Sequence, residues 1–208
     1  MTTLSQTKFA GTISQTTGTD RVSFSNLNNL KNENNTYAKT AKIGSKTDTK
    51  KKPATIECRN FGFNLPVGAE VKKIVVAYAH QKLDDVQGKY PSIAQPYIFL
   101  KNTGMVEAYK GQYGSTPQSS LQAKTKTWDG KSTEQVYVSG TSSQTSTGDI
   151  NVSTVTPKTK EITITYSLPK RTKINNSNFG VDITYPANTS ANKGYLQLKY
   201  IKIKVEYI

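Results

Sequence analysis

A short motif that occurs twice constrains the fold of this 208-residue chain more than any other feature. Residues 60–66 and 178–186 both begin with Asn-Phe-Gly, continue with alternating apolar and polar residues, and reach a proline. Such alternation predicts a short strand with one buried face, and the glycine permits a bulge or a close approach of another backbone. We expect four apolar side chains of the two motifs to be buried together in one core: Phe61, Phe63, Phe179 and Ile183.

The same alternation recurs along the chain and predicts an all-β protein. No segment longer than a few residues has a helical period, whereas many short segments alternate and are separated by turn residues. The segment 71–80 is apolar on both faces, which places it in the middle of a sheet that is covered on both sides. Such a series of strands favours an antiparallel β-sandwich or jelly roll. The clearest predicted strands are residues 56–65, 71–80, 97–101, 161–168 and 194–208.

The last predicted strand changes its alternation between Tyr200 and Ile201. This predicts either a β-bulge or a strand that crosses from one sheet to the other, and we expect residues 200–207 to lie beside one of the two Asn-Phe-Gly segments. No Pro/Gly linker separates two complete sets of strands, so residues 21–208 are expected to form one domain. The small polar residues 1–20 are expected to form an extended N-terminal arm.

The chain is strongly basic, with 28 Lys and Arg against 14 Asp and Glu, and its net charge is +14. A field of this sign attracts nucleic acid, anionic cell walls or membranes, or an acidic protein partner. The alternative is that lysines on strand surfaces keep a β protein soluble and protect its edges. Because the lysines are scattered and no nucleic-acid-binding motif is present, we do not expect nucleic acid as a partner.

The sequence holds few of the groups on which enzymes rely. It has one histidine, His80, and one cysteine, Cys58, and it lacks nucleophile-elbow, zinc-protease, P-loop and dinucleotide-binding motifs. Cys58 alternates with Ile56, which predicts a small core residue. The pair Asp84 and Asp85 lacks the spacing of a calcium loop. A carboxylate pair could still serve a glycosidase, but we expect no enzymatic activity, no metal and no cofactor.

Aromatic and basic side chains in polar segments are the candidates for contact with a ligand or partner. Trp128 lies beside a turn and is expected to be either an anchor in the core or its rim, or a platform on which a sugar stacks. Tyr109 and Tyr113 are further stacking candidates. Lys50, Lys51 and Lys52 end a charged hairpin tip, where they form either a solvated loop or a phosphate-binding patch.

The beginning of the chain shows no apolar stretch of a secretory signal, and no apolar run approaches the roughly 20 residues of a membrane helix. We therefore expect that the chain is made in a cytoplasm or is a mature form, and that it has no membrane partner.

Five blocks of this chain, in the same order, resemble a family of single-domain β-sandwich proteins encoded in the structural modules of tailed phages and prophages. The resemblance implies a component of the virion, on the tail, baseplate or capsid surface, without a cofactor. It also implies contacts with other virion proteins in a multi-copy assembly. Residues 101–150 match no block of the family. The matching blocks are residues 25–29, 37–38, 60–69, 177–181 and 200–207.

The function expected from these observations is that of a structural accessory subunit of a tailed-phage virion, which acts by binding other proteins. The alternative is a carbohydrate- or receptor-binding module that recognises a host cell-surface glycan or polyanion, with Trp128, Tyr109 and Tyr113 as its stacking residues.

Overall fold

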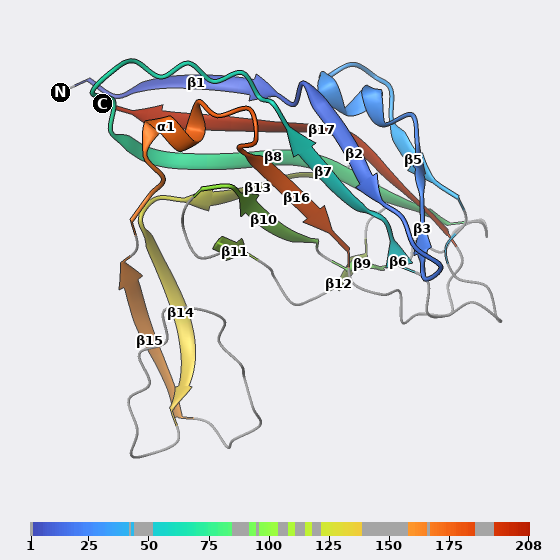
Figure 1. Cartoon of the computed structure of the whole chain (residues 1–208). Helices are drawn as coiled ribbons and strands as arrows, with labels where there is room; N and C mark the ends of the chain where they lie inside the picture. Colours follow the sequence, from blue (N-terminus) through green and yellow to red (C-terminus); the bar gives the residue numbers. More distant parts are fainter. Residues whose placement is uncertain are drawn as a thin grey trace.

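Two large sheets dominate the computed structural model (Figure 1). The structure describes residues 2–41, 43, 52–84, 92–94, 96–103, 108–110, 115–117, 122–138, 158–165, 167–185 and 194–208. Within these residues, the larger sheet has six strands in the order β13 (Gln122–Trp128), β8 (Val71–Asp84), β17 (Gly194–Tyr207), β5 (Ala38–Thr40) and β4 (Phe24–Ser25), with β1 (Leu4–Phe9) also paired to β17. The smaller has five, in the order β11 (Ala108–Lys110), β10 (Tyr97–Lys101), β16 (Gly180–Thr184), β7 (Thr55–Arg59) and β2 (Thr12–Thr16).

Short two-stranded pairs and two short helices complete the described part of the chain. Strand β9 (Ser92–Ala94) pairs with β12 (Ser115–Pro117), and β3 (Arg21–Val22) pairs with β6 (Lys52–Pro53) in parallel. The hairpin of β14 (Lys131–Val138) and β15 (Lys158–Thr165) extends away from the two large sheets (Figure 1). A 3₁₀ helix, η1, spans Leu27–Lys31, and the helix α1 spans Arg171–Ile174. The described strands confirm the all-β prediction.

The long strands β8 and β17 form the centre of the larger sheet. The prediction of a central strand is confirmed, because β8 lies between β13 and β17. The prediction that both of its faces are covered is only partly met, since Val75 and Ala77 on the outer face are half-buried. The strand also continues past His80, where the sequence predicted its end, to Asp84.

The predicted irregularity in the last strand is confirmed. The register of β17 against β8 shifts between Leu198 and Ile201, yet β17 pairs with β8 on both sides of the shift. The strand therefore contains a bulge and does not cross to the other sheet. The prediction that it lies beside an Asn-Phe-Gly segment is wrong, because its partners are β8, β1 and β5 in the larger sheet.

The two Asn-Phe-Gly motifs adopt different backbones. The second leads directly into β16, which pairs with β7 and β10. The first was predicted to continue the strand that begins at Ile56, but β7 ends at Arg59. Asn60 and Gly62 have φ values of 57° and 64°, and this left-handed conformation is incompatible with an extended ladder.

The first motif nevertheless keeps the alternation of burial that its sequence predicts. Phe61, Phe63 and Leu65 are buried, whereas Gly62 and Asn64 between them are exposed. Side-chain amides take the place of strand partners for two of its residues: Gln6 bonds both backbone groups of Asn64, and Asn175 bonds both backbone groups of Leu65. In this segment, the alternation of apolar and polar residues correctly predicts which side chains are buried, although the segment is not a β-strand.

One buried cluster includes residues of both large sheets. The Phe61, Phe63 and Phe179 rings pack against one another, with centroids 5.9–6.5 Å apart. Ile183 belongs to the same cluster and is fully buried, so the prediction that these four side chains are buried together is confirmed. Cys58 is fully buried as well, and burial raises the pKa of its thiol, as a small core residue requires.

The segment expected to be an N-terminal arm contributes an edge strand to each large sheet. Strand β1 pairs with β17 in the larger sheet, and β2 pairs with β7 in the smaller. Between them, the backbone N–H of Gly11 donates to the carbonyl oxygen of Asn60 at 2.9 Å. The chain therefore passes from one sheet to the other at the first Asn-Phe-Gly motif.

Candidate functional site

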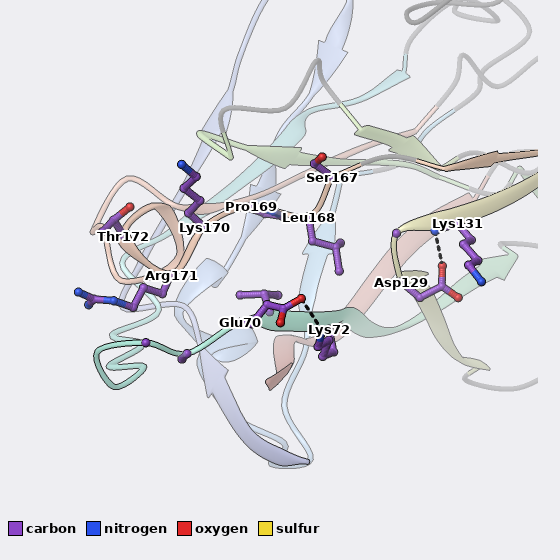
Figure 2. A pocket seen from close by; sticks show the side chains of 14 residues that line it. Glu70, Lys72, Asp129, Lys131, Ser167, Leu168, Pro169, Lys170, Arg171 and Thr172 are labelled. Carbon is purple, nitrogen blue, oxygen red and sulfur yellow. Dashed lines mark hydrogen bonds and ion pairs between the residues drawn. The ribbon is translucent and has the colours of Figure 1, made fainter. Parts of the chain in front are cut away.

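A groove of about 770 Å³ lies where three segments of the chain meet (Figure 2). Its walls come from residues 68–72 at the start of β8, residues 129–131 between β13 and β14, and residues 167–172, which lead into α1. Two turns with glycine at positive φ, Gly68 and Gly130, shape two of these walls. The volume falls within the range of sites that bind small molecules or short segments of chain.

Four basic and two acidic residues line the groove. Lys72 forms an ion pair with Glu70, and the Asp129 carboxylate accepts a hydrogen bond from the backbone N–H of Lys131 at 3.0 Å. The other three cationic groups, those of Lys131, Lys170 and Arg171, have no acidic partner within the described residues. Among the described residues, the lining therefore has an excess of positive charge that no ion pair neutralises.

Figure 2 shows how these side chains are distributed. Lys170 and Arg171 lie on one side of the groove and Lys131 on the opposite side, while Leu168 points into the space between them. Val71 and Pro169 add apolar surface, and none of the 14 lining residues is aromatic. The arrangement offers cations at two ends and an apolar middle.

The structure separates the contact residues that the sequence predicted. Trp128 precedes the groove residue Asp129, but its side chain is 1% exposed and fully within the core. This agrees with the anchor interpretation, and the buried indole offers no face for stacking. Lys52 lies in β6 and forms a 3.1 Å ion pair with Asp20, whose pKa it lowers through a side-chain hydrogen bond.

The other predicted contacts fall wholly or partly outside the described residues. Lys50, Lys51 and Tyr113 are not described, and for Tyr109 only the backbone is, paired with Phe99 in the β10–β11 ladder. Their roles stay predictions. The groove residues were missed because their signal in the sequence is weak: Lys170 and Arg171 follow a proline, and Lys131 follows an Asp-Gly turn far away in the chain.

His80 is part of a buried polar cluster in the core. Its Nδ1 lies 3.0 Å from the hydroxyl of Tyr185, which joins β8 of one sheet to the end of β16 in the other, and its ring packs edge-on against Tyr78. Burial, with a smaller contribution from the charge of Lys124, lowers the pKa of His80 to about 4. Burial also raises the pKa values of both tyrosines. These neutral, enclosed groups hold the sheets together.

Acidic groups do not gather into a metal site in the part of the chain that the structure describes: no three His, Cys, Asp or Glu side chains there lie close enough to hold an ion. Asp84 ends β8, and Asp85 lies outside the described residues.

Within the described ranges, no helix is long and apolar enough to cross a membrane.

The chain matches no model of a known protein family, and no curated protein is significantly similar to it.

Proposed function

We propose that the chain is a single β-sandwich domain that serves as a structural accessory subunit of a tailed-phage virion. Its activity is binding to other virion proteins, not catalysis, and it works without a cofactor in a multi-copy assembly. In support of a sandwich, the facing residues of the six-stranded and five-stranded sheets belong to one buried cluster.

The observation that carries the proposal is the meeting of sequence blocks that resemble the phage family. The backbone N–H of Asn60, in one block, donates to the carbonyl oxygen of Ser177, in another, at 2.8 Å. The phenylalanines of the same two blocks pack together in the core. Residues that carry the resemblance thus form one structural unit, which is what inheritance of a common fold would produce.

Charge and exposed strands supply the means of binding. The net charge of +14 would attract an acidic surface on the particle and speed the encounter. Among the described strands, β1 pairs only with β17, along one of its sides, and an edge strand of this kind can accept a further strand from a partner.

The glycan-binding alternative finds less support in the described residues. Its main stacking residue, Trp128, is buried, and none of the described residues that line the groove is aromatic. Sugar recognition relies on exposed aromatic faces.

The proposal is tested on purified particles. A lysogen that carries the gene is induced, the particles are banded and washed in high salt, and mass spectrometry measures this protein relative to the major capsid protein. We expect a constant ratio across washes. Loss of the protein from intact, washed particles would refute a virion role.

A further inference from the structure

We propose that the groove binds an extended acidic segment of a partner protein, with carboxylates at both ends of the groove and an apolar side chain between them. This deepens the proposed function, on which the choice of a protein as the partner rests. The groove is defined by the walls 68–72, 129–131 and 167–172.

The lining of the groove holds more basic than acidic residues. Lys131, Lys170 and Arg171 stand at the groove without an acidic partner in the described structure, whereas two lysines of the larger sheet share one carboxylate. Lys73 and Lys204 both pair with Glu206, at 2.9 and 2.8 Å. Uncompensated cations on opposite sides of one groove are complementary to a ligand that carries two separated carboxylates.

The middle of the groove is apolar. Leu168 points into it and is half-buried against the core, and the buried residues Val71 and Pro169 lie beneath it in the lining. An apolar side chain of a ligand would displace water there and gain about 25 cal/mol for each Å² that it buries. A purely phosphate-bearing polymer has nothing to place at this position.

The lining also distinguishes a peptide from a sugar. Glycans are held by aromatic stacking, and the 14 lining residues include none. A peptide needs charged ends, apolar contact and polar groups for its backbone, and Ser167, Thr172 and the Glu70–Lys72 pair provide the last of these.

The probe is a fluorescein-labelled peptide of sequence Glu-Glu-Leu-Glu-Glu, and its binding to the full chain is followed by fluorescence anisotropy at physiological salt. The groove variant combines Lys131→Ser, Lys170→Ser and Arg171→Ser. The control variant removes the same charge elsewhere through Lys8→Ser, Lys31→Ser and Lys199→Ser, none of which lines the groove. We expect the groove variant to raise Kd by at least about tenfold and the control by less than about threefold.

The apolar contact is tested without altering the protein. Replacing the leucine of the probe by alanine should raise its Kd for the unmodified chain about three- to tenfold, while leaving its Kd for the groove variant nearly unchanged. Circular dichroism and the melting temperature establish that both variants are folded.

Three results would overturn the inference. Equal weakening by the groove and control variants would show attraction by net charge alone, and an undetectable effect of either would show that the peptide binds elsewhere or not at all. Displacement of the peptide by wall teichoic acid at lower concentration than by unlabelled peptide would assign the groove to a polyanion. If the peptide binds as predicted but the protein is missing from washed particles, the virion role is refuted and the groove proposal stands. If the protein stays on washed particles but the peptide does not bind as predicted, only the groove proposal is refuted.

Discussion

At three positions in this chain, side-chain amides form the backbone hydrogen bonds that a neighbouring strand would otherwise supply. Gln6, Gln15 and Asn175 each bond both the N–H and the carbonyl of one residue, at 2.7–3.2 Å. The residues they hold are Asn64, Phe24 and Leu65. Each pairing imitates the exchange between two strands and satisfies backbone groups where no strand is available. The abundance of Asn and Gln in the sequence therefore has a structural use.

Asn175→Ala should lower the free energy of unfolding by about 2 kcal/mol, because it leaves the backbone of the buried Leu65 without partners. Gln6→Ala removes an equivalent but exposed pairing, and water replaces it at a cost below about 1 kcal/mol. Urea denaturation measures both. If both substitutions lowered the free energy of unfolding equally, burial would not determine how much these amide hydrogen bonds stabilise the protein.

Protonation of His80 should make the protein less stable in acid. The pKa is 6.5 in the unfolded chain and about 4 in the fold, so the unfolded chain binds more protons between these values. Stability is therefore full above pH 6.5 and falls as pH drops towards 4, by up to about 3 kcal/mol from this group. His80→Gln keeps a polar partner for Tyr185 and cannot titrate.

The measurement is the free energy of unfolding of both proteins from pH 4 to pH 7. The difference between them isolates His80, because Asp20, Asp182 and the other titrating groups are common to both. Parallel curves would contradict the assignment.

At the scale of elements, the sequence predicted burial better than it predicted ladders. The central position of β8, the bulge in β17 and the four buried side chains of the repeated motifs followed from alternation. The end of β7 did not, because Phe61, Phe63 and Leu65 alternate as a strand would while the left-handed Asn60 breaks it. The partner of β17 also could not be derived, since pairing depends on contacts across the whole chain. The groove was not predictable, because three distant segments with ordinary composition form it.

The glycines of the two motifs are required for different reasons, and we expect substitutions at the two positions to have different effects on stability. A Cβ on Gly180 would lie 1.9 Å from the carbonyl oxygen of Cys58, so Gly180→Ala should cost more than about 3 kcal/mol or prevent folding. Gly62 has φ of 64° with open space around it, so Gly62→Ala should cost only about 1–2 kcal/mol.

Asparagine provides the matched control, because it tolerates left-handed backbone. Gly62→Asn should be milder than Gly62→Ala, whereas Gly180→Asn should be as damaging as Gly180→Ala. Denaturation midpoints decide the matter, and the same ranking at both sites would contradict it.

At the scale of the whole molecule, one buried cluster includes residues of both large sheets, and the N-terminal segment adds an edge strand to each sheet. The basic groove lies where residues 68–72, 129–131 and 167–172 meet. The β14–β15 hairpin extends away from the two large sheets (Figure 1). We propose that the protein associates with a virion particle through its charged, exposed surfaces.

The most direct test of this association uses particles of a phage whose gene for this protein has been deleted. Purified, labelled protein is added to these particles. Sedimentation then gives the bound amount against concentration. We expect the unmodified chain to bind saturably to a fixed number of sites per particle, and the groove variant to bind with lower affinity. Binding that never saturates would contradict the virion role. So would an affinity for particles no higher than that for a resin carrying an unrelated acidic protein.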